Sequence, residues 1–169
     1  MNQKVKNYIK QLGLVRHPEG GYFREVYRSG ELILQKHLPK RYKSTRNFST
    51  SIYFLLEGKQ FSSFHKLKSD ELWHFYDGST VIVYIIDKKG ILSIQKLGKE
   101  KECIFQLTIR KEHWFAAEVE DKKSFSLFGC TVSPGFDFED FELGGGMMLI
   151  KKFPQHEEII RRLTTQKKY

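Results

Sequence analysis

From residue 51 onwards the chain consists of short segments rich in aliphatic and aromatic residues, each followed by a turn signal. Gly58, Gly78 and Gly90 stand in turns between these segments. The segments recur roughly every 8–12 residues with no helical pattern between them, which is typical of a β-sandwich or barrel. We therefore expect an all-β barrel with strands at 51–56, 60–67, 71–76, 80–86, 91–97, 104–109, 113–118 and 124–132.

The two ends of the chain carry helical patterns instead. Apolar residues recur at the spacing of one helix face between Val5 and Leu12, and Gly13 is suited to end that helix. Pro154 is suited to begin a second helix near the C-terminus. We expect one domain, with a helix, a strand at 22–28 and a basic loop in 1–50, the barrel core in 51–150, and a helix in 151–169.

The net charge of +9 is concentrated at the two ends of the chain. Residues 1–50 hold 11 Lys and Arg against 3 acids and residues 151–169 hold 6 against 2, whereas residues 51–150 hold 12 against 15. The stretch from Lys36 to Arg46 has five bases and no acid. Such a stretch can contact phosphates, but no known nucleic-acid-binding pattern accompanies it. We favour a solvated loop and expect no nucleic-acid partner.

Membrane and secretion signals are missing from the sequence. No apolar run reaches the roughly 18 residues that a membrane helix needs, and the N-terminal residues lack the apolar segment of a signal peptide. Cys103 and Cys130 form no CxxC pair and are expected to be free thiols in a reducing compartment. We therefore expect a cytoplasmic protein with no membrane partner.

His65 and Glu71 flank a tight turn between two of the expected strands. Because alternate residues of a strand point to the same side, each of the two has companions on its own face. These are Ser63 and Leu67 for His65, and Trp73 and Phe75 for Glu71. If both faces point inward, they form a pocket with aromatic walls and a few polar groups, which is the usual composition of a small-molecule site.

Around these residues the chain resembles the cupin superfamily. Gly58, His65, Glu71 and Gly78 are similar to the first cupin motif, and the closest resemblance is to a branch of small uncharacterised proteins known as cupin family five. The matching segments are 14–29, 51–56, 69–78, 114–117 and 129–142. The resemblance implies a jelly-roll β-barrel, a homodimer, and a small-molecule ligand in the mouth of the barrel. It implies no particular reaction.

Metal-binding cupins use three histidines and one glutamate, and the resemblance places only two of these ligands in this chain. The first histidine falls on His65 and the glutamate on Glu71, but the other two positions fall on Leu67 and Phe115, which cannot bind a metal. His113 shares a face with Phe115 and could supply a third ligand. A divalent zinc, iron or nickel ion bound by His65, Glu71 and His113 is therefore kept as an alternative, and our favoured hypothesis requires no cofactor.

Without a metal, His65 is the candidate general base, with Glu71 orienting its imidazole. Metal-free sugar-nucleotide epimerases of the cupin superfamily look similar at this point. That resemblance suggests Tyr53 as the acid and Arg24 and Arg28 as diphosphate ligands.

The favoured hypothesis is a cupin that binds a small molecule, with an epimerase or isomerase of a sugar nucleotide or other polar metabolite as its most specific form. Its pocket walls would be Ser63, Trp73 and Phe75. The alternatives are a ligand sensor without catalysis and a metal-dependent enzyme.

Overall fold

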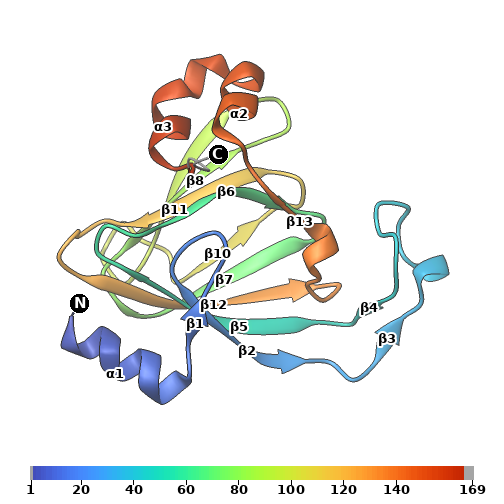
Figure 1. Ribbon diagram of the computed structural model, residues 1–169, viewed down its shortest axis with the longest axis horizontal. Coiled ribbons are helices and arrows are strands. Elements are labelled where there is room, and N and C mark those ends of the chain that lie inside the picture. The colour runs from blue at the N-terminus through green and yellow to red at the C-terminus, as the bar shows by residue number, and fades with distance from the viewer. Residues whose placement is uncertain (1, 166–169) are drawn as a thin grey trace.

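Two antiparallel sheets face each other in the computed structural model, which describes residues 2–165 (Figure 1). The first sheet contains, in spatial order, β1 (Val15–Arg16), β2 (Tyr22–Arg28), β5 (Thr50–Glu57), β12 (Phe125–Ser133), β7 (Asp70–Gly78) and β10 (Gln106–Ile109). The second contains β13 (Phe141–Leu143), β6 (Phe61–Leu67), β11 (Trp114–Val119), β8 (Val81–Ile86) and β9 (Leu92–Leu97). The all-β fold expected from the turn spacing is confirmed.

The space between the sheets is filled by aromatic and aliphatic side chains at one end of the barrel. Trp73 stacks on Phe128 with ring centroids 4.5 Å apart, and Phe115 meets the Trp73 ring edge-on at 6.1 Å. These side chains belong to a buried cluster to which both sheets contribute. Large rings occupy this end, and a cavity lies at the other end, where β6 ends and β7 begins.

The outer face of the first sheet is covered by α1 (Gln3–Leu12), as expected from the N-terminal helical pattern. Asn2 caps the start of the helix by accepting the backbone N–H of Lys4, and Gly13 ends it in the left-handed conformation with a φ of 63°. Val5 is fully buried in a cluster with Leu55 and other residues of the sheet. The helix thus holds the N-terminal segment, and with it the following loop, against the barrel.

The C-terminal helix expected from Pro154 is present, and a further helix that was not expected precedes it. The C-terminal segment forms α2 (Gly146–Lys152), a 3-10 turn η3 (Pro154–His156) and α3 (Glu157–Arg162). Phe153 separates them because its backbone angles, φ −135° and ψ 65°, are not helical. Leu149 and Ile160 are buried against the outer face of the second sheet, so tertiary packing accounts for helices this short.

Residues 29–49 form an arm that projects from the barrel (Figure 1). It contains β3 (Leu32–Ile33), which pairs with β4 (Arg46–Asn47), and a 3-10 turn η1 (Gln35–His37). Part of the expected solvated loop is not solvated, because Arg46 is 2% exposed and donates two hydrogen bonds of 2.6 and 2.8 Å to Asp140. Arg41 donates to the backbone carbonyl of Lys68. These two bases therefore have structural partners.

The segment 136–141 has the sequence Phe-Asp-Phe-Glu-Asp-Phe, whose apolar and acidic residues suggest a charged edge strand, but most of it does not form a strand. Asp137 caps a 3-10 turn η2 (Phe138–Asp140), and the edge strand β13 begins only at Phe141. The turn forms because the Asp137 side chain accepts the backbone N–H of Glu139 and because Arg46 binds Asp140. The aromatic residues of this segment are thereby brought over one end of the barrel.

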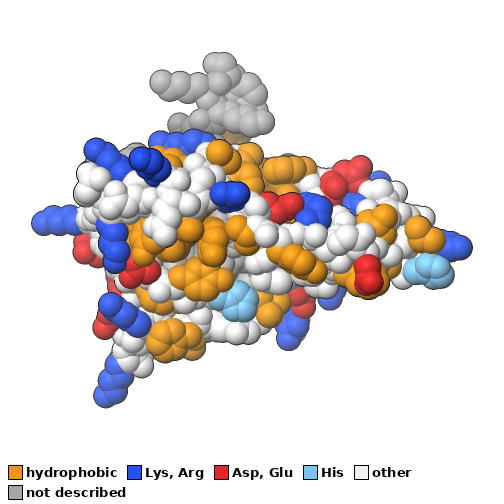
Figure 2. Space-filling model, turned by 90° about the horizontal axis from the view of Figure 1, so that it is seen from below, with side chains coloured by type: hydrophobic (Ala, Val, Ile, Leu, Met, Phe, Trp, Pro, Cys, Tyr) orange, Lys and Arg blue, Asp and Glu red, His pale blue; other side chains and the backbone are white. Residues whose placement is uncertain are grey.

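Several large hydrophobic side chains remain exposed outside the barrel. Figure 2, which views the molecule from the side of α1 and β2, shows hydrophobic side chains spread over much of that face, with basic side chains among them. On β1, β2, β7 and the arm the exposed set is Val15, Val26, Tyr27, Leu32, Leu34, Phe48 and Tyr76. No helix of the part of the chain that the structure describes is long and apolar enough to cross a membrane.

Candidate functional site

A cavity of about 170 Å³ lies at the end of the barrel that the core rings leave free. It is bounded by β2, β5, β6, β7, β12, the loop before β2 and the segment 136–141. Its apolar lining residues are Phe23, Ile52, Phe54, Leu67, Val132, Phe136, Phe138 and Phe141. Its polar lining residues are His17, Glu19, Glu25, Arg28, Thr50, His65, Glu71, Cys130 and Asp137.

The buried polar end of the cavity is organised around Glu19. Its Oε2 atom lies 3.2 Å from Nε2 of His65 and 3.5 Å from Nδ1 of His17, and its Oε1 atom accepts a 2.8 Å hydrogen bond from Ser62. All of these side chains lie almost fully inside the protein. The carboxylate partner of His65 is therefore Glu19, which comes from a loop far away in sequence, where the sequence suggested Glu71.

The hydrogen bonds of the cluster fit a protonated Glu19 between two uncharged imidazoles. Nδ1 of His65 is 2.7 Å from the carbonyl of Ser63, so in the uncharged imidazole Nδ1 donates to this carbonyl and Nε2 offers its lone pair to Glu19. Nδ1 of His17 accepts the backbone N–H of Glu19 at 3.3 Å and therefore carries its lone pair on this side. Between two such acceptors, the Glu19 carboxyl carries the proton. The cluster is thus a neutral acid between two neutral imidazoles.

The pKa values of the cluster agree with this assignment. Burial raises the pKa of Glu19 well above its usual range, and the nearby Glu71 carboxyl raises it further. Burial lowers the pKa of His65 to about 3 and that of His17 to about 4. At neutral pH both imidazoles are uncharged, so His65 is an acceptor for the Glu19 proton.

Glu71 stands at the same end of the cavity in a different state. It is 7% exposed, and its Oε2 atom has no hydrogen-bond partner within residues 2–165. Burial raises the pKa of Glu71 to about 7, and the neighbouring Trp73 indole and Cys130 thiol oppose this shift. A carboxyl group of this kind is partly ionised at neutral pH and has no counter-ion among the residues that bound it.

Arg28 lies at the mouth of the cavity, and its guanidinium is occupied. Nε and Nη2 donate to the two carboxylate oxygens of Glu25 at 2.9 and 2.7 Å, and Nη1 donates to Asn47 at 2.8 Å. Nη2 also donates to the backbone carbonyl of Phe136 at 3.2 Å. Arg28 therefore ties β2 to the segment 136–141 and has little capacity left for an anionic ligand.

The structure brings His65, Glu71 and Arg28 to one cavity, together with Leu67. Trp73 and Phe75, suggested as pocket walls, instead belong to the packed core or lie against it, away from the cavity lining.

Ser63, Tyr53 and Arg24 also lie outside the cavity lining. Ser63 turns away because β6 has a register shift against β11 between its pairings with Ala117 and Phe115, so Ser62 replaces it on the inner side. The Ser63 hydroxyl lies 3.0 Å from that of Thr165.

Tyr53 and Arg24 have partners on the outside of the first sheet. The Tyr53 ring packs against the ring of Tyr76, with centroids 5.9 Å apart. The Arg24 guanidinium donates to the backbone carbonyl of Leu12 at the end of α1.

His17 and Glu19 are the site residues that sequence reasoning missed. They stand in the turn 17–21, which contains two glycines. Gly20 has a φ of 117°, and a Cβ atom there would lie 2.1 Å from the carbonyl oxygen of Phe61. This close approach lets the turn press against β6, where the Ser63 N–H donates to the Glu19 carbonyl. The glycine pair was the available signal, but it does not tell which strand the turn meets.

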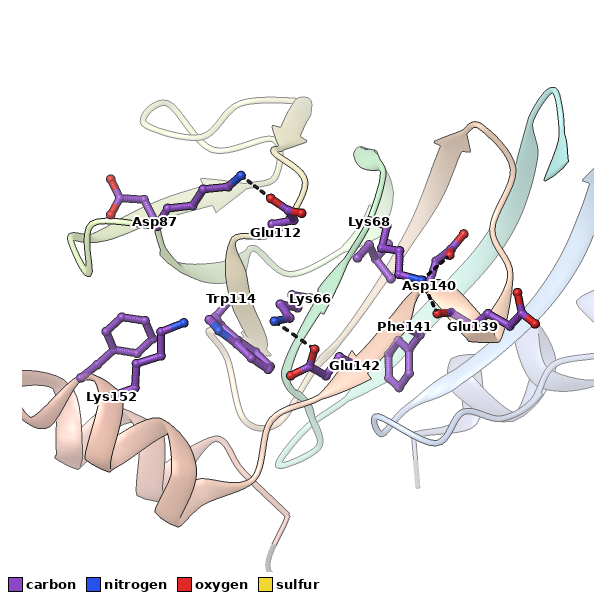
Figure 3. A pocket seen from close by; sticks show the side chains of 13 residues that line it. Lys66, Lys68, Asp87, Glu112, Trp114, Glu139, Asp140, Phe141, Glu142 and Lys152 are labelled. Atoms are coloured by element: carbon purple, nitrogen blue, oxygen red, sulfur yellow. Dashed lines mark hydrogen bonds and ion pairs between the residues drawn. The ribbon is translucent and has the colours of Figure 1, made fainter. Parts of the chain in front are cut away.

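A second hollow of about 500 Å³ lies outside the barrel, between β6, β13 and α2 (Figure 3). Six of its nine charged side chains pair with each other: Lys66 with Glu142 at 2.9 Å, Lys68 with Asp140 at 3.1 Å, and Lys88 with Glu112. This groove is separated from the cavity by Leu67 and Phe141, which line both. Because most of its charges are already paired, the groove is a weaker candidate than the cavity.

Comparison with known families agrees with the fold and the motif. Residues 6–144 match the family described as Cupin superfamily (DUF985). The chain belongs to the cupin superfamily. An uncharacterised protein of Saccharomyces cerevisiae, YML079W, is 30% identical over 149 residues, which cover 80% of this cupin and 73% of the yeast protein.

Solved structures extend the comparison. Protein SO0799 of Shewanella oneidensis has a TM-score of 0.85 and 35% identity, covering 96% of this cupin and 98% of that chain. A hypothetical protein of Leishmania major has a TM-score of 0.84 and 30% identity, covering 95% and 98%. Oxalate decarboxylase of Bacillus subtilis has a TM-score of 0.55 and 17% identity, covering 91% of this cupin and 37% of that chain. This last likeness shows the fold alone.

The residues of this cupin do not fit a cupin metal centre. Two of the four ligand positions hold Leu67 and Phe115, whose side chains are buried and apolar. His113 precedes β11 and does not line the cavity with His65 and Glu71. Across the described residues 2–165, no group of three or more His, Cys, Asp and Glu side chains is arranged to hold a metal ion.

Proposed function

We propose that this cupin binds a small organic molecule in the barrel cavity, with a polar group of the ligand against Glu71 and an apolar body against the phenylalanine walls. The partnerless Oε2 atom of Glu71 carries the proposal, because a buried carboxyl oxygen without a hydrogen bond destabilises the protein unless something else supplies the bond. A concave site with aromatic walls and convergent polar groups is typical of a ligand site.

The cavity also limits what the ligand can be. Its volume of about 170 Å³ lies below the roughly 300–1,000 Å³ of sites for drug-sized ligands. A sugar nucleotide would not fit whole, and its diphosphate would have to lie outside the cavity. The two arginines suggested as diphosphate ligands are not placed to bind it there, because Arg24 lies on the outer face of the sheet and Arg28 is bound to Glu25. We therefore narrow the ligand suggested by the epimerase resemblance to a small molecule without a diphosphate.

Filling the cavity tests this proposal. Fragment binding is measured by ligand-observed NMR with the wild type and with Val132→Phe, whose larger ring would occupy the cavity. Binding is expected to disappear in this variant, at a loss of about 1–3 kcal/mol of stability from overpacking. Val15→Phe on the exposed β1 strand is the matched control and should bind like the wild type. Fragments that still bind Val132→Phe would place the site elsewhere, with the groove of Figure 3 as the next candidate.

A second candidate function is isomerisation by proton transfer, favoured by the two carboxyl groups with different pKa values. Glu71, with a pKa of about 7, is suited to remove a proton from a carbon next to a carbonyl group. Glu19, which stays protonated, would turn its proton from His65 to the carbonyl oxygen; the protonated Glu71 then delivers its proton to another carbon and the oxygen returns its proton to Glu19, which completes the isomerisation. In this scheme Glu71 is the base, Glu19 is the acid, and His65 accepts the Glu19 hydrogen bond in the resting protein.

Solvent exchange distinguishes this candidate from binding alone. A carbonyl ligand found in the fragment screen is incubated with the protein in D2O, and deuterium at its carbon atoms is followed by NMR. Catalysed exchange in the wild type and its loss in Glu71→Gln are expected if proton transfer occurs. Tight binding of the ligand without deuterium exchange at its carbon atoms would favour a non-catalytic role, as a ligand sensor or carrier.

We also propose a homodimer, which the resemblance to cupin family five suggests. The exposed hydrophobic set on β1, β2, β7 and the arm supports a pairing surface (Figure 2). Light scattering after size exclusion at low and high salt tests it, and a monomer under both conditions would refute it. The cytoplasmic location stays a prediction.

A further inference from the structure

The charges around the cavity are unbalanced. Glu25, Glu71 and Asp137 face Arg28, the one cation among the described residues that line it. Arg28 neutralises Glu25 through two hydrogen bonds. Glu19 adds no charge because its proton lies between two imidazole acceptors. An anionic ligand would therefore meet Glu71 and Asp137 with no free cation in this lining to pair with.

Glu71 lacks a counter-charge, and one of its oxygens lacks a hydrogen bond. Its Oε2 atom is buried and unpaired within residues 2–165, and the donors beside the carboxyl, the Trp73 indole and the Cys130 thiol, are uncharged. The two histidines at this end cannot supply a donor from the ring nitrogens that face Glu19, because both of these nitrogens act as acceptors. A ligand N–H group would supply both the missing hydrogen bond and, if protonated, the missing positive charge.

The walls of the cavity suit a positive charge too. Phe136, Phe138 and Phe141 meet edge to face, with centroids 5.1 to 6.4 Å apart, and line the cavity together with Phe23 and Phe54. The faces of aromatic rings attract ammonium groups by about 0.5–2 kcal/mol, with the larger values where water is excluded. Aromatic walls combined with one buried carboxylate form a typical site for an organic cation.

We propose that the ligand of this cavity is a small organic cation, a protonated amine with an apolar body, whose nitrogen pairs with Glu71. The proposal rests on the proposed ligand-binding function and names the class of its ligand. It also separates the two candidate functions, because a carboxylate held by an ammonium group becomes a weaker base. A cationic ligand therefore favours binding over proton removal by Glu71.

Three probes of similar shape and different charge test the proposal. Benzylamine, benzyl alcohol and benzoate are titrated into the full chain at about pH 8, where a group with the pKa of Glu71 is mostly ionised. Calorimetry and ligand-observed NMR report the affinity. Benzylamine is expected to bind at least about tenfold more tightly than benzyl alcohol, and benzoate more weakly than either.

Two variants locate the contact. In Glu71→Gln, which preserves shape and removes the charge, the affinity for benzylamine should fall to that for benzyl alcohol. Glu120→Gln, an exposed glutamate paired with Lys96 on another part of the surface, is the matched control and should leave all affinities unchanged. Melting temperatures of both variants verify that they fold.

The outcomes are separable. Binding of benzyl alcohol or benzoate equal to that of benzylamine would overturn the cation class and leave the ligand site standing. Undiminished benzylamine binding in Glu71→Gln would also overturn it. The cavity would be refuted as a ligand site if none of the three probes bound and if fragments bound Val132→Phe as tightly as the wild type.

Discussion

At the scale of single residues, the chemistry of the site depends on two glutamates in different states. Glu19 is neutral because its neighbours accept its proton. Glu71 has no such partner, and burial alone raises its pKa to about 7. These states lead to two predictions about stability, one from the pKa shift of Glu71 and one from the hydrogen bonds of Glu19.

Glu71→Gln should become more stable than the wild type as the pH rises. The folded pKa of Glu71 is raised from 4.5 to about 7, so folding binds this proton more tightly and the wild type loses stability as the pH rises through this window. The shift corresponds to roughly 3 kcal/mol once the group is fully ionised. Urea unfolding at about pH 5 and pH 8 should show a small difference at the lower pH and most of this difference at the higher. A difference that does not change with pH would contradict the raised pKa.

Glu19→Gln should be tolerated better than Glu19→Leu. A glutamine amide can still donate to His65 and accept from Ser62, so we expect a loss within about 1 kcal/mol. Leucine leaves both partners unsatisfied and should lose about 1–3 kcal/mol more. Chemical denaturation at neutral pH measures both variants. Equal losses would instead indicate an ionised Glu19 paired with a charged imidazole.

At the scale of structural elements, the cavity is closed by a segment that a buried ion pair holds in place. Arg46 on the arm binds Asp140 in η2, and Lys68 on the turn after β6 binds the same carboxylate at 3.1 Å. The aromatic walls Phe138 and Phe141 stand on either side of this contact in sequence. Arg46 therefore does not line the cavity, but it holds in place the segment that does.

Arg46→Met should loosen this closure. Breaking a buried pair by removing one partner costs about 3–5 kcal/mol, and the remaining contact with Lys68 should keep the loss near the lower value. Hydrogen exchange followed by mass spectrometry should show faster exchange in 44–48 and 136–143. Lys96→Met, which breaks an exposed pair with Glu120, is the control and should lose at most about 1 kcal/mol. Unchanged protection in the two segments would show that the pair does not hold them.

At the scale of the whole molecule, the two buried histidines and the two buried glutamates should give a stability plateau on the acid side of neutral pH. The pKa values of His17 and His65 are lowered from 6.5 to about 4 and about 3, so the unfolded chain takes up protons first as the pH falls below 6.5. Stability is then lost toward acid, in the direction opposite to the Glu71 effect.

Urea midpoints measured from about pH 4 to pH 9 test this balance. The unfolded chain takes up protons at two histidines over about the same range in which it releases them from Glu19 and Glu71, so we expect a plateau at about pH 5–6 and a fall on either side. A midpoint that rises steadily as the pH falls from about 7 to 5 would show that these imidazoles are not buried in their neutral form.

The β-barrel could be predicted from the sequence because its signals are local. Turn residues and alternating hydrophobic residues mark each strand whatever its neighbours are, and the same holds for Gly13 at the end of α1. The single domain over 1–169 stays a prediction. The helix α2 and the turn η2 escaped prediction because partners elsewhere stabilise them: the second sheet for α2, and Arg46 for η2.

The site was determined partly by the sequence and partly by the tertiary structure. Strand alternation around the turn at 68–70 was enough to bring His65 and Glu71 to one cavity. Only the tertiary structure decided that His65 pairs with Glu19, since this contact spans 46 residues and depends on a glycine turn pressed against β6. The register shift in β6 likewise replaced Ser63 by Ser62. Charge states of buried groups depend on which atoms surround them, and that arrangement exists only after the chain has folded.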